Sequence, residues 1–300
     1  MMGTSYSQKS DTTYHNNLDY IHTGNYTSEV QGEELYVKFS NSEAQKDFKF
    51  SSKIPMSRVS VNQGNDPGNS YTIPGDAGVL SLHSDGTYQF EESNEMRSLL
   101  KSKGLKKTPP GMYLMMTLGA LDKASIELLR KEDFALNVND LVAVASSQMD
   151  LSVLQSKIAL LNTLESKERT LKTLVMMENL HIDKNTIDTM SKHTTVEEAR
   201  DLNKIAQWVS MKIDEDFLSM LSGAGYAQPS FKDIMSAKSH KIDANYITEI
   251  KEQGYSDLTL KNIVTLKSMQ ITGPWIAKVN AKNGSKLPIS KLINLKTSSN

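Results

Sequence analysis

Histidine and cysteine are the side chains that most often bind metals or act as nucleophiles, and this chain has six histidines and no cysteine. No histidine combines a second histidine or a carboxylate four residues away with a third ligand, as a helical metal site requires. Without cysteine, thiolate catalysis, disulfides and Cys-based zinc or iron–sulfur sites are excluded. We therefore predict no metal site, and surface or structural roles for His15, His22, His83, His181, His193 and His240.

Two pairs of adjacent glutamates are the next candidates for chemistry. Glu91-Glu92 and Glu197-Glu198 point to different sides of a strand or helix, so neither pair is placed to share a proton transfer. The run Gly223-Ala224-Gly225 could begin a dinucleotide-binding loop, but it follows a helical pattern and lacks the third glycine. We interpret it as the end of a helix. These patterns predict no catalytic residue, no cofactor and no enzymatic activity.

The C-terminal lysines could bind a polyanion. The segment 258–300 contains seven lysines and no acidic residue, so it carries +7 and the rest of the chain −8, for a formal net charge of −1. Such a patch could bind a phosphate backbone, or an anionic lipid or glycan. The simpler interpretation is a set of solvated helix faces, because Lys267 and Lys296 occupy equivalent places in a repeat described below. The candidate residues are Lys261, Lys267, Lys278, Lys282, Lys286, Lys291 and Lys296.

A short motif recurs about every thirty residues and marks the helices on which these lysines are expected to lie. It consists of an aliphatic residue, then Asp or Thr, then another aliphatic residue four positions later. Its polar positions are separated by 28, 33, 31, 29 and 29 residues. They are Asp122, Asp150, Asp183, Asp214, Asp243 and Thr272.

Each of these polar residues is predicted to start a helix. Its side chain can accept a hydrogen bond from the first turn, and the negative charge of Asp suits the helix N-terminus. Gly225-Tyr226 and Gly254-Tyr255 follow about eleven residues later and are typical of helix ends. A second helix then returns the chain to the next cap. The unit is a helix pair of about thirty residues, and neighbouring pairs must stack to bury their apolar stripes.

Trp208 and Trp275 lie at apolar positions of this repeat. We predict that both pack in the core, and the alternative role is a platform for a ligand.

The N-terminal third has a different pattern. Residues 1–30 are polar and lack a sustained period, which predicts a disordered tail. Residues 31–92 alternate, with Asp85-Gly86 as a hairpin turn, and predict a small antiparallel β-sheet. Residues 93–300 predict an all-α helical-repeat domain, or solenoid. The predicted fold class is α+β.

These features together resemble a known family. The hairpin 78–90, the helix that ends at Gly104, the Gly-Tyr joints and the aliphatic-Asp-x-x-Tyr-Ile step are similar to the non-catalytic C-terminal extension of bacterial BlaR-type membrane metallopeptidases and related Bacteroidetes proteins. The resemblance covers residues 78–300 and implies an extracytoplasmic sensing or protein-contact region. The catalytic part of that family carries His-Glu-x-x-His. This chain has no His-Glu pair, so no catalytic residue is carried over.

The sequence therefore predicts a non-enzymatic sensor or protein-interaction module that presents a helical-repeat surface to another protein. Polyanion or nucleic-acid binding through the C-terminal lysines is the alternative. No apolar run reaches eighteen residues, so no membrane span is predicted. Residues 1–8 resemble the cleavage end of a bacterial signal peptide, which favours a periplasmic or secreted location. Without a leader upstream of Met1, the prediction would be the cytoplasm.

Overall fold

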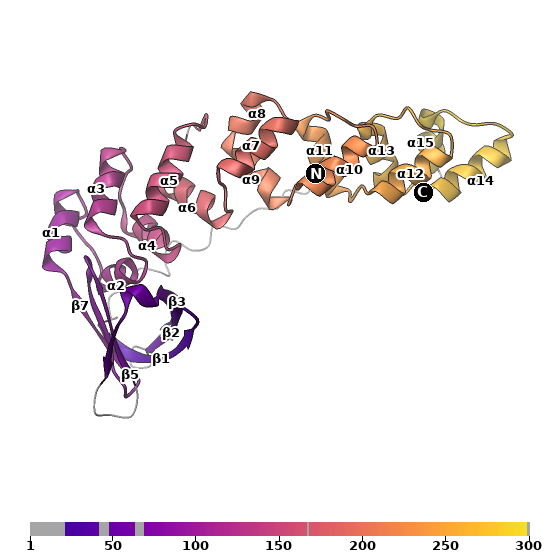
Figure 1. Ribbon diagram of the computed structural model, residues 1–300. Helices are drawn as coiled ribbons and strands as arrows, with labels where there is room; N and C mark the ends of the chain where they lie inside the picture. Colours follow the sequence, from indigo (N-terminus) through magenta and orange to yellow (C-terminus); the bar gives the residue numbers. More distant parts are fainter. Residues whose placement is uncertain (1–21, 42–47, 64–68, 167, 299–300) are drawn as a thin grey trace. The chain divides into compact units, whose positions relative to one another are not determined.

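The computed structural model describes residues 22–41, 48–63, 69–166 and 168–298. Strands β1 to β7 come first and helices α1 to α15 follow (Figure 1), so the predicted α+β fold class is confirmed. The chain divides into two compact units. The first holds the sheet and α1 to α6, and the second holds α7 to α15.

The sheet contains seven strands in the order β3-β2-β1-β7-β6-β5-β4, and every neighbouring pair is antiparallel. Its strands are β1 (Thr23–Gln31), β2 (Glu34–Asn41), β3 (Phe48–Pro55), β4 (Ser60–Gln63), β5 (Asn69–Gly75), β6 (Gly78–Leu82) and β7 (Thr87–Glu92).

The two edge strands of this sheet are consecutive in sequence. Only a short 3₁₀ helix, η2 (Met56–Arg58), and Val59 connect β3 to β4. This connection can span at most about 18 Å, whereas a flat sheet of this width would put its edges about 29 Å apart. The sheet must therefore curl until its edges meet at η2. The pairing also makes β3 and β4 run in the same direction, so they act as one broken strand that pairs first with β2 and then with β5.

Apolar side chains fill the inside of the curl. Leu35, Val37 and Phe39 alternate inward along β2, as the sequence predicted. Tyr88 lies 5.2 Å from Phe39 in an edge-to-face contact, and its ring leaves no room for a Cβ on Gly24 of the neighbouring strand. The Tyr88 hydroxyl is buried and has no hydrogen-bond partner among the described residues, and burial raises its pKa to about 12. The Asp85-Gly86 hairpin turn is also present, with Gly86 at φ 83°.

The predicted tail is wrong from Thr23 onward, because β1 lies inside the sheet between β2 and β7. Tyr26 is the one buried residue of this strand. Backbone hydrogen bonds to strands on both sides hold β1 in place, and a search for hydrophobic alternation does not detect such bonds. Residues 1–21 of the predicted tail lie outside the described residues.

Six helices pack with the sheet in the first unit, so the predicted division at residues 92 and 93 does not separate compact units. Helix α2 is the centre of this packing. It contacts β5, β6 and β7 on one side and α4 on another, and most of its side chains are buried. The helices of this unit are α1 (Asn94–Ser102), α2 (Pro110–Leu118), α3 (Lys123–Lys131), α4 (Val138–Ser146), α5 (Leu151–Leu161) and α6 (Leu171–Asn179).

The second unit consists of helices throughout its described residues, and α10 to α15 form three consecutive pairs of the predicted kind. Its helices are α7 (Lys184–His193), α8 (Val196–Arg200), α9 (Leu202–Ser210), α10 (Glu215–Gly223), α11 (Phe231–Ser239), α12 (Ala244–Glu252), α13 (Leu260–Ser268), α14 (Gly273–Asn283) and α15 (Ile289–Thr297).

Candidate interaction surface of the helix pairs

Every predicted cap residue starts a helix, which confirms the repeat motif. In each case the side-chain oxygen accepts a hydrogen bond from the backbone N–H three residues later. The donor–acceptor distances are 2.7 Å at Asp122, 2.9 Å at Asp150, 2.8 Å at Asp183, 2.8 Å at Asp214, 2.7 Å at Asp243 and 3.4 Å at Thr272.

A left-handed residue precedes each cap by two positions, and the sequence analysis missed this feature. None of these corner residues is glycine, and their φ angles lie between 52° and 56°. At Lys241 the backbone N–H bonds to Lys238, and the following Ile242 N–H bonds to Ala237, so the preceding helix closes as in a Schellman motif. The fixed spacing to the cap was the available signal. The corner residues are Ala120, Gln148, His181, Lys212, Lys241 and Gln270.

In the first unit, the sheet contacts these corners. The Gln148 side-chain amide donates to the backbone carbonyl of Lys53 on β3 at 2.7 Å. At the other corner, Asp76 accepts a hydrogen bond from the backbone N–H of Lys123 at 2.9 Å. The corner edge of the first unit is therefore a surface that already binds strands and turns of the same chain.

Arg58 strengthens this contact, and sequence reasoning did not identify it. It extends from η2 and donates to the carbonyls of Leu118, at 2.9 Å, and of Thr117. These carbonyls lie in the last turn of α2, where the regular hydrogen bonds of the helix end. Burial lowers the pKa of the guanidinium, but the group stays charged because the unperturbed arginine pKa is so high.

In the second unit, the corner residues Lys212, Lys241 and Gln270 are exposed. A hollow of about 350 Å³ lies beside Gln270, lined also by Asp243 and Glu249. Tyr246 closes its base, and its hydroxyl donates to the carbonyl of Ile271 at 2.7 Å. Burial raises the pKa of this phenol. The hollow is thus a gap between two successive corners.

Three of the candidate lysines pack against aromatic rings of the helix pairs. Lys267 Nζ lies 4.2 Å from the Tyr246 ring centroid, and Lys296 Nζ lies 5.5 Å from that of Trp275. Lys286 lies 4.6 Å from the ring of Tyr255 and also donates to the carbonyl of Gly254. Such cation–π contacts stabilise the pairs.

The other four candidate lysines are exposed, and none forms an ion pair within the described part of the chain. They lie on three helices, α13, α14 and α15. The seven candidates are therefore divided between packing and open surface. The exposed four are Lys261 on α13, Lys278 and Lys282 on α14, and Lys291 on α15.

The pair α14–α15 exposes apolar positions that the preceding pair buries. Residues 29 positions apart are equivalent in α12–α13 and α14–α15. Leu266 is 0% exposed, whereas its equivalent Leu295 is 36% exposed. Tyr246, Ile250 and Leu260 are buried, whereas their equivalents are half-buried. We call these four more exposed residues the end face, and they are Trp275, Val279, Ile289 and Leu295.

The end face is a local feature, and the last pair itself is well packed. Ile276 and Leu292 are each 0% exposed. Their equivalents in the preceding pair, Ile247 and Ile263, are 1% and 0% exposed. Trp208 is buried, as predicted, but Trp275 is half-buried, which corrects the prediction that both tryptophans pack in the core. The sequence could not show this, because Trp275 has the residue type and spacing of a core position.

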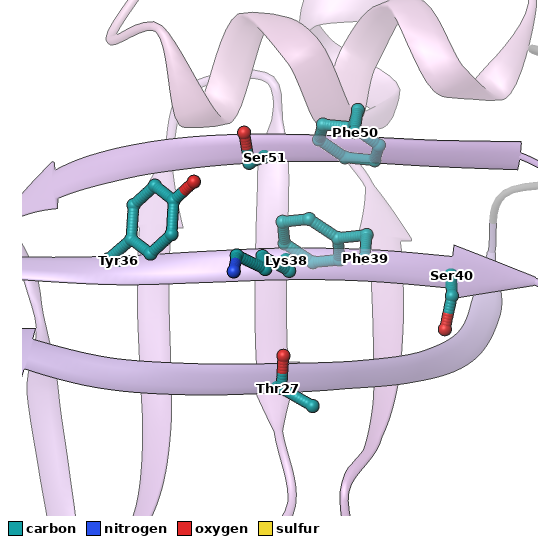
Figure 2. Close-up of a pocket in the computed structure, with 7 residues that line it drawn as sticks. All are labelled: Thr27, Tyr36, Lys38, Phe39, Ser40, Phe50 and Ser51. Atoms are coloured by element: carbon teal, nitrogen blue, oxygen red, sulfur yellow. The ribbon is translucent and has the colours of Figure 1, made fainter.

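A second hollow, of about 380 Å³, lies on strands β1, β2 and β3 (Figure 2). Phe39 and Phe50 stack there with centroids 4.4 Å apart. The register sets Thr27, Lys38 and Ser51 in one row across the three strands. Lys38 is the one charged side chain in the lining, so the hollow offers ring faces and hydrogen-bond donors but no acid–base pair.

No family model, curated protein or solved structure matches this chain. The resemblance to the extension of BlaR-type metallopeptidases therefore stays a prediction.

Two of the described histidines contact glutamates. His22 contacts Glu92 at 3.2 Å and His193 contacts Glu215 at 3.4 Å, while His15 lies outside the described residues. Across the described ranges, no three side chains of His, Cys, Asp or Glu form a group that could hold a metal ion. Gly225 ends α10 in the left-handed region, at φ 93°, as predicted. No helix in the described part of the chain is both long and apolar enough to cross a membrane.

Proposed function

We propose that this protein is a non-enzymatic interaction module that binds a partner protein through the helix pairs of its second unit. The end face supports this proposal most strongly. It exposes one aromatic and three aliphatic side chains at positions that the preceding pair buries against a neighbour. Clustered apolar side chains surrounded by polar ones are typical of protein-binding surfaces.

The construction of the pairs also favours binding. Each pair is held by a cap and a corner of fixed geometry, so the exposed side chains lie on well-defined helices. A preorganised surface loses little conformational entropy when it binds a partner. We keep the periplasm or the cell surface as the expected location, on the pattern of residues 1–8, with the cytoplasm as the expectation if no leader precedes Met1.

Polyanion binding remains the second candidate, carried by the four exposed lysines. The other three lysines already contact aromatic rings, which restricts how far their ammonium groups can reach toward a polyanion. A polyanion would also leave the end face unused. We therefore favour a protein partner.

Site-specific photo-crosslinking tests the proposal. A benzophenone side chain replaces Leu295 on the end face, and a matched chain carries it at the exposed Ser219 of α10. Irradiation in cells of the source organism should yield a covalent adduct with another protein from position 295 and not from position 219. Equal adducts from both positions, or none from position 295, would contradict the proposal.

A further inference from the structure

The contact between the last two pairs shows what covers a face of this kind. Tyr246 of α12 donates its hydroxyl to the carbonyl of Ile271, which lies at the corner before α14. Tyr255 donates its hydroxyl to the carbonyl of Leu287, just before α15, at 2.6 Å. The cover is therefore a helix pair, and the two carbonyls that accept these hydrogen bonds lie just before the starts of its helices.

The end face repeats the apolar half of this arrangement. Trp275 takes the place of Tyr246, and its indole N–H has no acceptor within the described residues. Half-buried tryptophans of this kind often dominate the binding energy of an interface. An amphipathic helix would supply both an apolar stripe for the end face and an acceptor for the indole.

The charged half of the arrangement is inverted. Glu249 in the inner pair accepts a hydrogen bond from the backbone N–H of Gly273 in the next pair. Its equivalent in the last pair is Lys278, which can only donate. Asp257 is likewise replaced by Lys286. A further pair that offered the same amide to the end face would therefore find no acceptor at position 278.

The surroundings add positive charge to this inversion. Lys278, Lys282 and Lys291 are exposed on α14 and α15, and residues 258–300 contain no carboxylate side chain. A second copy of the chain, docked face to face, would bring lysines opposite lysines. A partner with carboxylates beside its apolar stripe would neutralise them and would steer its own approach.

We infer that the end face binds an acidic amphipathic helix of a partner protein. The apolar stripe of that helix covers Trp275, Val279 and Leu295, and its Asp or Glu side chains pair with the lysines of α14 and α15. The inference rests on the proposed function and names the class of its partner.

The test uses synthetic helices of about 18 residues with leucines at i, i+3, i+4 and i+7, a length and pattern sufficient to present one apolar face. Three probes carry Glu, Gln or Lys beside the leucines, and binding to the full chain is measured by fluorescence anisotropy. The Glu probe should bind about ten-fold or more tightly than the Gln probe, with the Lys probe weakest and the difference shrinking at high salt.

Two sets of variants separate the apolar from the charged contribution. Leu295→Ser with Ile289→Ser removes apolar contacts without adding charge, and Val196→Ser, at a 58% exposed site on α8, is its control. Leu295→Ser alone is the milder form if the double variant melts early by circular dichroism. Lys278→Glu, Lys282→Glu and Lys291→Glu reverse the exposed charge. The control for this lysine set reverses the charge of three exposed lysines on other helices, namely Lys172, Lys184 and Lys232.

An acidic helix requires both contributions. Each set of variants should therefore weaken binding of the Glu probe by about ten-fold or more, while the controls leave its affinity unchanged. Two results together would identify a polyanion surface and overturn the inference. The lysine variants would no longer be retained on heparin, and the serine variants would bind the Glu probe as tightly as the unmodified chain. Self-association that increases in the lysine set would identify a second copy and also overturn it.

The crosslinking experiment keeps the two claims apart. A protein adduct from position 295 together with equal affinity for the three probes would overturn the acidic helix and leave the interaction module standing. Absence of the adduct would overturn the interaction module itself.

Discussion

The two units use the same helix pair but cover it differently. In the first unit, Arg58, Asp76 and Gln148 join the corners of the pairs to the sheet. In the second unit, the equivalent corners at Lys212, Lys241 and Gln270 face solvent. One local motif therefore builds an internal support in one region and an open surface in the other.

The difference lies in a few side chains rather than in the backbone. Gln148 and Lys241 have the same φ of 52° and the same distance from a cap. Both residues are exposed, but the Gln148 side chain donates a hydrogen bond to a strand carbonyl. The cap and corner fix the helix pair, and the residues around them decide what the pair contacts.

The largest expected effect concerns a close backbone approach in the first unit. A Cβ on Gly119 would lie 2.1 Å from the carbonyl oxygen of Ala145, so Gly119→Ala should destabilise the first unit by about 3 kcal/mol or more. Gly223 of the second unit has open space around it, and Gly223→Ala should be neutral or stabilise by about 0.5–1 kcal/mol. Chemical denaturation measures both. Similar changes in stability at the two glycines would contradict this difference between the units.

Arg58 tests the link between sheet and corner. Arg58→Met keeps an unbranched apolar stem but removes the guanidinium that donates to the carbonyls of Thr117 and Leu118. We expect a loss of about 2–3 kcal/mol from the first unit and none from the second. Hydrogen exchange resolved by segment measures the two units separately, with Lys131→Met as the surface control. Equal loss of protection in both units would contradict the account.

Equivalent caps should differ between the units. Asp122 accepts from both the backbone N–H and the buried hydroxyl of Ser125, whereas Asp243 accepts from the backbone N–H of Tyr246 alone. Asp122→Ala should therefore cost about 2 kcal/mol and Asp243→Ala about 1 kcal/mol of unfolding free energy. The Asp→Asn variants, which retain an acceptor, are the controls in the same denaturation series. Equal costs at the two sites would remove this distinction.

The smallest effect has the opposite sign. Lys241 is a non-glycine residue at φ 52°, so Lys241→Gly should stabilise the second unit by about 0.5–1 kcal/mol. Lys232→Gly, at an exposed position inside α11, should instead destabilise by a similar amount. A loss of stability at position 241 would show that its side chain forms contacts that the exposed corner lacks.

The sequence predicted what depends on local periodicity. The six caps could be read directly, because an Asp or Thr before an apolar run has one local hydrogen-bonding role. The corners at Lys212 and Lys241 were missed, because lysine itself gives no sign of a left-handed backbone and only the fixed spacing to the cap marks these positions. Strand β1 was missed because it has one buried side chain, and Arg58 because its partners lie about sixty residues away. Exposure of Trp275 depends on what lies next to α14, which no local pattern contains.

The fluorescence of Trp275 gives the most direct test of the claim that the end face is an open docking surface. In a Trp208→Phe variant, Trp275 is the single tryptophan of the chain. We predict that acrylamide quenches its emission in the free protein, and that the Glu-bearing helix shifts the emission to shorter wavelength and reduces the quenching. Unchanged emission and quenching at the highest soluble concentration of that helix would contradict the account.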